Sequence, residues 1–157
     1  MAEIVDNSLE ELDLVNVDVG EYRVTNDKTL TVDGLGTCMG IAAYDPKTRE
    51  SYLLHASTWE NEDLERQIEE FVDEISEIGR PYEVLAAGTM DSKYNPLTDE
   101  EFAEEARSIA ENILEEREVP FETAWNNEPV YNRLTVSPEY GILYDRPEEF
   151  ITDIETE

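Results

Sequence analysis

The sequence predicts a single α+β domain in which mixed β-sheet layers are covered by two main helices. Residues 61–78 and 98–116 carry apolar side chains at the three- and four-residue spacing of amphipathic helices. Most other apolar residues fall in short runs bounded by Gly, Pro, Asn and Asp, which is typical of strands. Strands therefore precede, separate and follow the helices, which favours one domain over residues 1–157.

The first predicted strands follow an acidic N-terminal segment. Within that segment, Ser8 can cap a short helix with Glu11 as its capping-box partner, or residues 1–18 can form a mobile arm. Residues 22–24 and 29–32 are predicted to form short strands on either side of a polar turn.

Residues 38–55 are predicted to form a β-hairpin. The run Met39–Tyr44 is apolar, the turn Asp45–Thr48 contains a φ-fixing proline, and a second apolar run ends at His55. Two strands joined by such a turn normally pair. Counting outward from the turn places Cys38 and His55 at matching ends of the two strands.

The two helices have separate start and stop signals. The first, residues 61–78, has acidic residues in its first turn, and a Gly and a Pro follow its end. Its apolar stripe consists of Leu64, Ile68, Phe71, Val72, Ile75 and Ile78. The second helix is predicted to begin at a capping box formed by Thr98 and Glu101 and to run to Glu116.

Further strands are predicted around the second helix. Residues 82–87 precede it, and residues 121–125, 133–136 and 141–144 follow it. Residues 147–157 are expected to form an acidic tail.

The chain is strongly acidic, with 40 Asp and Glu residues against 11 Lys and Arg residues and a formal net charge of −29. A small domain usually carries a net charge of about 2–8 in magnitude. Three explanations compete: mimicry of nucleic acid or binding to a basic partner, disorder, or adaptation to a halophile's cytosol, in which molar salt screens self-repulsion. The apolar periodicity argues against disorder, and the spread of acids along the whole chain favours salt adaptation. The charge also argues against direct binding to nucleic acid, which needs a basic surface.

The single cysteine excludes an internal disulfide and favours a reducing compartment. The N-terminus lacks the pattern of a signal peptide, and no apolar run approaches the ~20 residues of a membrane span. We therefore expect a cytoplasmic protein without membrane insertion, and we also expect a monomer. The sole histidine is assigned to the cysteine, so we expect no metal site and no cofactor.

Cys38 and His55 are the only cysteine and the only histidine, and the predicted hairpin brings them together. A histidine that takes the thiol proton turns a cysteine into a nucleophile and later protonates the leaving group. This interpretation predicts that Cys38 forms a thiolate below about pH 8. The alternative is structural: Cys38 is a small buried hydrophobic residue, and His55 is a strand-end residue with a satisfied hydrogen bond.

A hydrolase of this kind also needs donors for an oxyanion and a group that orients the histidine. Backbone N–H groups at Gly36, Thr37 and Cys38 are candidates for the first role, because glycine allows close approach of the backbone. The side chains of Thr31, Thr37 and Thr89 are candidates for the second role.

The segment GLGTCMGIAAYDP, followed by an apolar stretch that ends at His55, resembles the CheD family of chemoreceptor glutamine deamidases. Further similarity is found at Val19–Tyr22, Ala86–Met90, Arg133 and Tyr140–Leu143. The resemblance implies a layered α/β architecture and a Cys38–His55 pair that deamidates glutamine on the cytoplasmic domain of a chemoreceptor. It also implies a partner from the chemotaxis phosphatase group. The same chemistry would hydrolyse a glutamate methyl ester.

Departures from the family pattern favour a second hypothesis. Val32 stands where the family carries a threonine, and Thr31 is one residue earlier, on the opposite face of a strand. Residues 56–58 and 125–127 do not keep the family's Leu-Pro and Gly-Gly-Asn motifs. The alternative function is a non-catalytic CheD-like adaptor or binding module for a signalling protein.

We predict that the protein unfolds in dilute buffer and refolds in molar salt, because a net charge of −29 repels itself unless it is screened. Melting temperatures measured in low and in high salt test this expectation. Equal melting temperatures in the two buffers would contradict salt adaptation.

Overall fold

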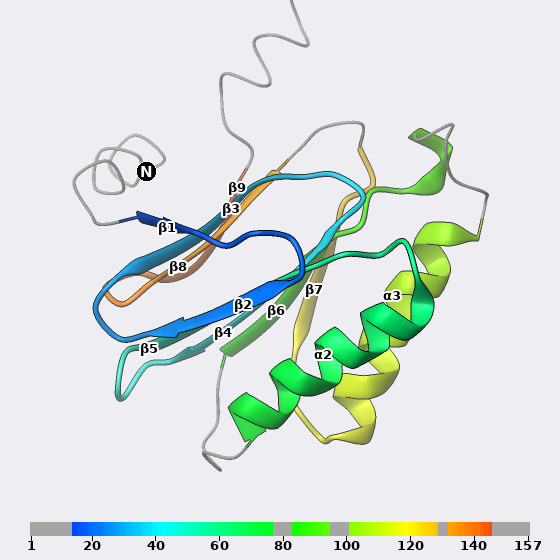
Figure 1. Ribbon diagram of the computed structural model, residues 1–157. Coiled ribbons are helices and arrows are strands. Elements are labelled where there is room, and N and C mark those ends of the chain that lie inside the picture. Colours follow the sequence, from blue (N-terminus) through cyan, green and yellow to red (C-terminus); the bar gives the residue numbers. More distant parts are fainter. Residues whose placement is uncertain (1–13, 77–82, 95–100, 129–131, 146–157) are drawn as a thin grey trace, which may run out of the picture.

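The computed structural model describes residues 14–76, 83–94, 101–128 and 132–145. These residues form three layers (Figure 1): a four-stranded sheet, a five-stranded sheet and two α-helices. The five-stranded sheet is the middle layer, because one of its faces packs on the helices and the other on the four-stranded sheet. The predicted α+β class, with two helices covering mixed sheets, is confirmed.

The middle sheet has the strand order β2-β5-β4-β6-β7. Its strands are β2 (Glu21–Thr25), β5 (Glu50–Ala56), β4 (Met39–Asp45), β6 (Glu83–Gly88) and β7 (Glu122–Trp125). β4 pairs antiparallel with both β5 and β6, and β7 runs parallel to β6. The predicted hairpin is the β4–β5 pair, in which Asp45 lies opposite Glu50 beside the turn.

The outer sheet has the strand order β1-β3-β8-β9. Its strands are β1 (Leu14–Asn16), β3 (Thr29–Leu35), β8 (Asn132–Ser137) and β9 (Gly141–Asp145). β1 runs parallel to β3, and the other neighbouring pairs are antiparallel. β1 is not among the predicted strands, because a strand of 3 residues is too short to show an alternating pattern.

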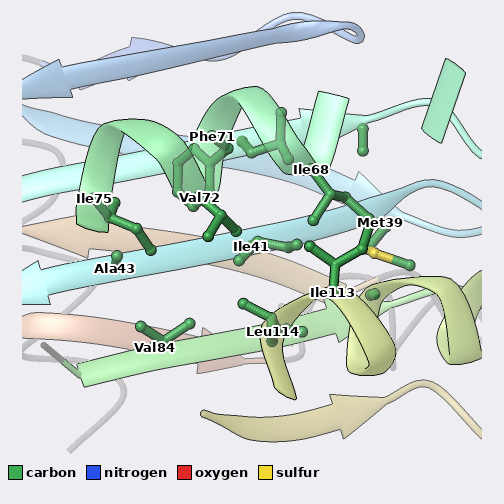
Figure 2. Close-up of a cluster of buried hydrophobic side chains, with 14 of the residues drawn as sticks. Met39, Ile41, Ala43, Ile68, Phe71, Val72, Ile75, Val84, Ile113 and Leu114 are labelled. Atoms are coloured by element: carbon green, nitrogen blue, oxygen red, sulfur yellow. The ribbon is translucent and has the colours of Figure 1, made fainter. Parts of the chain in front are cut away.

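The helices α2 (Asn61–Ser76) and α3 (Phe102–Glu116) cover the face of the middle sheet that points away from the outer sheet. Figure 2 shows their apolar side chains meeting those of the strands in one buried cluster. It includes Met39, Ile41 and Ala43 from β4, Ile68, Phe71, Val72 and Ile75 from α2, Val84 from β6, and Ile113 and Leu114 from α3. Within the described residues, no helix has the length and apolar character needed to cross a membrane.

Some predicted features fall outside the described residues. They are the short helix that Ser8 can cap, the first 13 residues of the arm predicted at residues 1–18, the end of the first helix at residues 77–78, the capping threonine Thr98 and the tail at residues 147–157. The rest of the predicted arm is ordered, because it contains β1. A short 3₁₀ helix, η1 (Ser92–Tyr94), precedes α3 and is not among the predicted elements.

β4 separates two apolar cores, and all of its residues are buried. Met39 and Ile41 face the helices, whereas Ala42 belongs to the cluster between the two sheets. A Cβ atom added to Gly40 would lie 2.7 Å from Cδ2 of Leu134 on β8. The missing side chain at Gly40 therefore lets the two sheets approach closely at this point.

We predict that Phe71→Ala lowers the free energy of unfolding by about 3–5 kcal/mol, because it removes a large apolar side chain and leaves a cavity. Phe71 is completely buried, and its ring packs edge-on against that of Tyr22 with centroids 5.8 Å apart. Urea unfolding in molar salt measures the loss. The control is Val24→Ala at a side chain that is 43% exposed on β2, where we expect a change of less than about 0.5 kcal/mol. Equal losses in the two variants would contradict this description of the core.

Candidate active site

Cys38 and His55 lie on the same face of the middle sheet. Cys38 directly precedes β4 and packs against the cluster between the sheets, which also contains Leu53 of β5. Leu54 and Ala56 belong to the cluster on the helix side. Because side chains alternate along a strand, His55 shares the face of Leu53 and therefore of Cys38.

The register of the hairpin makes Cys38 and His55 diagonal neighbours. Gly40 lies directly opposite His55, and Cys38 is two residues before Gly40. Diagonal neighbours of this kind have Cα atoms about 7–8 Å apart, with somewhat closer side chains. Gly40 has no side chain that could stand between the thiol and the imidazole. A distance between Sγ and an imidazole nitrogen within about 5 Å, as in a loose catalytic hydrogen bond, stays a prediction.

A backbone carbonyl orients the imidazole of His55. Its Nδ1 lies 2.9 Å from the carbonyl oxygen of Val17. A carbonyl oxygen only accepts hydrogen bonds, so Nδ1 carries the proton and Nε2 of the neutral ring is left as the base. The N–H of Val17 donates to the carbonyl of Thr31 at 3.0 Å, and the N–H of Gly20 donates to the carbonyl of His55 at 2.7 Å. Residues 17–20 are thus held against both sheets beside the ring.

Glu21 of β2 is a second group next to His55. It lies directly opposite His55 in the β2–β5 pair, so the two side chains share one face of the sheet. Arg23 is close to its carboxylate, with Nη2 3.7 Å from Oε1. Glu21 is part of the Gly-Glu-Tyr segment in the sequence, but only the strand register places it beside His55.

The turn before β4, residues 36–38, is fixed through its carbonyl groups. The carbonyls of Gly36 and Cys38 accept hydrogen bonds from the backbone N–H groups of Met90 and Thr89, at 2.7 and 2.9 Å. The carbonyl of Thr37 accepts one from the Thr58 hydroxyl at 2.8 Å. Within the described part of the chain, the N–H groups of Gly36, Thr37 and Cys38 donate no hydrogen bond. No described residue therefore competes for these N–H groups.

Residues 88–90 form a strained support beneath this turn. Gly88 and Thr89 have φ values of 86° and 52°, a left-handed conformation that is costly for threonine. A Cβ atom added to Gly88 would lie 2.7 Å from the carbonyl oxygen of Cys38. Arg107 of α3 donates to the carbonyl of Thr89 from Nε at 3.2 Å and from Nη2 at 2.7 Å, and also to the carbonyl of Asn126 at 3.1 Å. α3 thereby fixes residues 88–90, and these residues in turn fix the turn that contains Cys38.

Two of the three threonine side chains that were candidates for orienting His55, those of Thr31 and Thr89, form no hydrogen bond with the imidazole. Thr31 alternates with Leu30 and Val32, which face the cluster between the sheets, so its side chain points to the other face of β3. There its hydroxyl is 3.1 Å from that of Thr135, so the structure does not bring it to His55. Thr89 contacts Cys38 through its backbone, while its buried hydroxyl has no partner among the described residues. The group that holds His55 is the Val17 carbonyl, and no side-chain pattern in the sequence signals it.

Burial raises the pKa of the Cys38 thiol above its ordinary value. The thiol is half-buried, and the loss of hydration disfavours the thiolate. Burial therefore favours the neutral thiol and works against the thiolate expected below about pH 8. A nucleophilic role for Cys38 would therefore require a base that removes the thiol proton during the attack.

Two hollows among the described residues lie away from Cys38 and His55. One of about 480 Å³ is lined by Glu83, Val84, Leu85 and residues 120–122, at the opposite end of β6 from Gly88. One of about 350 Å³ is lined by Asn61 and by α3 residues such as Glu105. Among the described residues, no group of three or more His, Cys, Asp or Glu side chains is arranged to hold a metal ion.

Part of the sequence is similar to curated proteins named "Probable chemoreceptor glutamine deamidase CheD". The protein of Archaeoglobus fulgidus is 51% identical over 39 residues, and that of Natronomonas pharaonis is 39% identical over 41 residues. The Geobacter metallireducens protein, named CheD 2, is 42% identical over 43 residues. These matches support a divergent relationship to CheD. They cover 25–27% of this chain, and the chain spans only about a quarter of the length of these CheD proteins, 25–26%. No family model matches the chain.

Two solved structures that resemble the chain carry names other than CheD. A Neisseria meningitidis protein described as DUF152 has a TM-score of 0.51 and 11% identity, over 81% of this chain and 68% of that one. The Bacillus licheniformis hypothetical protein YfiH has a TM-score of 0.45 and 13% identity, over 66% of this chain and 50% of that one. At 11% identity, the first likeness shows the fold alone, and it leaves the more specific CheD-like architecture as an expectation.

We predict that the Cys38 thiol titrates above the ~8.5 of an ordinary cysteine, because burial favours the neutral form. Raising the pH through the normal cysteine range should therefore leave most of the protein as thiol. The ultraviolet absorbance of the thiolate measures the midpoint, and Cys38→Ala supplies the blank because the chain has no other cysteine. A midpoint below that of free cysteine would mean that an imidazolium at His55 stabilises the thiolate at rest.

Proposed function

We propose that the protein is a cysteine-dependent amidohydrolase that deamidates glutamine side chains on the cytoplasmic domain of a chemoreceptor. The observation that carries this proposal is the hydrogen bond between Nδ1 of His55 and the Val17 carbonyl, because it leaves Nε2 as a base on the face that Cys38 shares. The similarity to proteins named as glutamine deamidases supports the choice of glutamine.

The first half of the proposed reaction forms a thioester. Sγ of Cys38 attacks the carboxamide carbon while its proton passes to Nε2 of His55. The π electrons of the carbonyl move to oxygen, and the N–H groups of the turn before β4 stabilise the oxyanion. The carboxylate of Glu21 lies on the side where the imidazolium forms and favours its charge. The tetrahedral intermediate collapses, the C–N bond breaks, and ammonia leaves with the proton of His55.

The second half releases the product. His55 takes a proton from water, and the hydroxide formed attacks the thioester carbon. The C–S bond then breaks, the proton returns to sulfur, and the glutamine side chain has become glutamate. A glutamate methyl ester would give the same thioester with methanol as the leaving group, so methylesterase activity belongs to the same proposal.

The raised pKa of Cys38 selects between two forms of this mechanism. A preformed thiolate–imidazolium pair needs a thiol pKa below that of the imidazolium, whereas burial raises the pKa of this thiol. The proposed mechanism therefore couples proton transfer to carbon–sulfur bond formation. The general base is then essential, and such a base contributes about 10²–10⁴-fold in rate.

The setting of the reaction is part of the proposal. We propose a cytoplasmic protein that acts on a chemoreceptor and is regulated by a chemotaxis phosphatase-type partner. An acidic receptor and a protein of charge −29 repel each other in dilute buffer, so their association should require high salt.

A non-catalytic adaptor is the second candidate function. Two observations favour it: burial raises the pKa of the Cys38 thiol, and Val32 faces the cluster between the sheets where the CheD pattern has a threonine. An adaptor would bind the receptor or its partner through the same fold and leave glutamine unchanged.

We predict that receptor fragments incubated with the protein in molar salt gain one dalton at specific glutamines. Cys38→Ala should abolish this gain, and His55→Ala should slow it by about 10²–10⁴-fold, because each removes a partner in the proton transfer. Mass spectrometry of proteolysed fragments measures the rate. Val24→Ala, which alters an exposed β2 side chain, is the matched control and should retain full activity.

Two outcomes would contradict the enzyme proposal. Deamidation that persists in Cys38→Ala would show that Cys38 is not the nucleophile. Tight receptor binding by the wild-type protein without any mass change, together with equal binding by Cys38→Ala, would establish the adaptor function instead.

A further inference from the structure

The Thr58 hydroxyl is the only side-chain group, among the described residues, with a hydrogen bond to the turn before β4. Thr58 follows β5, is 1% exposed and donates to the carbonyl of Thr37 at 2.8 Å. The carbonyls of Gly36 and Cys38 are held by backbone N–H groups instead. A substitution at Thr58 therefore changes one contact to this turn and leaves the other two in place.

The contact made by Thr58 determines where the N–H of Cys38 points. The carbonyl of Thr37 and the N–H of Cys38 belong to one peptide group, and the described residues contain no cis peptide bond. In a planar trans peptide, the C=O and N–H bonds point in opposite directions. Holding the carbonyl against Thr58 therefore directs the N–H of Cys38 away from Thr58, and that N–H donates to no group among the described residues.

The N–H of a nucleophilic residue is well placed to stabilise an oxyanion. It is joined to Sγ through Cα and Cβ, so it lies close to the oxygen of any carbonyl that Sγ attacks. The backbone N–H of the nucleophilic serine has this role in serine proteases. Such a donor accelerates the reaction only when its direction is fixed before the charge develops.

We infer that Thr58 is a positioning residue that fixes the Thr37–Cys38 peptide so that the Cys38 N–H binds the oxyanion formed at the attacked carbon. This inference rests on the proposed hydrolase function. It assigns Thr58 to oxyanion stabilisation and leaves the thiol and the general base unchanged.

Two small probes of Cys38 separate oxyanion stabilisation from simple reactivity. Propanal forms a thiohemiacetal oxyanion: sulfur bonds to the carbonyl carbon, the carbonyl electrons move to oxygen, and the thiol proton passes to Nε2 of His55. The former carbonyl oxygen then accepts a hydrogen bond from the Cys38 N–H. Methyl iodide reacts by displacement: sulfur bonds to the methyl carbon, iodide leaves, the thiol proton passes to Nε2 of His55, and no oxyanion forms. Both probes need the thiol, but only propanal needs the oriented N–H.

We predict that Thr58→Val, which removes the hydroxyl at similar volume, weakens propanal binding at least about tenfold, because the loss of an oxyanion donor costs about 10²–10³ in rate. The rate with methyl iodide should not change. Thr58→Ser keeps the hydroxyl and should restore propanal binding. Thr29→Val removes a hydroxyl that is equally buried but has no partner among the described residues, and it should alter neither probe. In the deamidation assay, Thr58→Val should lower kcat and leave KM unchanged.

Each result has one meaning. Equal losses with propanal and methyl iodide would make Thr58 a structural residue and overturn the inference, as would full propanal binding by Thr58→Val. A selective loss of propanal binding in a protein that deamidates no receptor would uphold the inference and refute the proposed substrate. Circular dichroism in the same molar-salt buffer confirms folding, and Thr58→Ala is used in place of Thr58→Val if that variant is unfolded.

Discussion

The burial of β4 on both faces is the constraint on which the rest of the structure depends. One face of the strand anchors the helices through Met39 and Ile41, and the other meets the outer sheet at Gly40 and Ala42. A strand held between two cores cannot shift its register without moving apolar side chains into the wrong layer. The start of β4 is therefore a rigid place for Cys38. Paired strands on both sides supply the other parts of the site, with His55 on β5 and the residue 88–90 support at the end of β6.

Much of this arrangement could be predicted from local sequence. The turn at Asp45, the two apolar runs and the sole Cys and His were enough to predict the hairpin and its matching ends, because strand pairing across a short turn is a local event. The Val17 carbonyl could not be predicted. A backbone oxygen has no residue type that identifies it, and Val17 reaches His55 only after the two sheets have packed. The direction of Thr31 follows from strand parity, but its partner Thr135 lies far along the chain and comes close only through the β3–β8 register.

Desolvation and surface charge act on the pKa of the Cys38 thiol over different distances. The sequence suggests a competition between a helpful imidazolium and many unfavourable carboxylates. In the structure, the cause of the raised pKa is burial, which depends on the atoms packed around Sγ and not on the net charge of −29. The surface acids lie in water, where salt screens them within about 10 Å or less. The net charge of the surface and the ionisation of Cys38 can therefore vary independently in this fold.

The fold by itself does not select a chemistry. A likeness at 11% identity extends over 81% of the chain, yet it concerns the arrangement of layers and no side chain of the site. What distinguishes a hydrolase from an adaptor here is the agreement of three small features. The imidazole has its proton on the nitrogen that faces Val17, the turn before β4 has N–H groups that none of the described residues accepts, and Gly40, directly opposite His55, has no side chain of its own. None of these features is needed to fold the β4–β5 hairpin, since a leucine at position 55 would pair as well. Their combination at one end of one strand pair is what a general base, an oxyanion and a nucleophile require together.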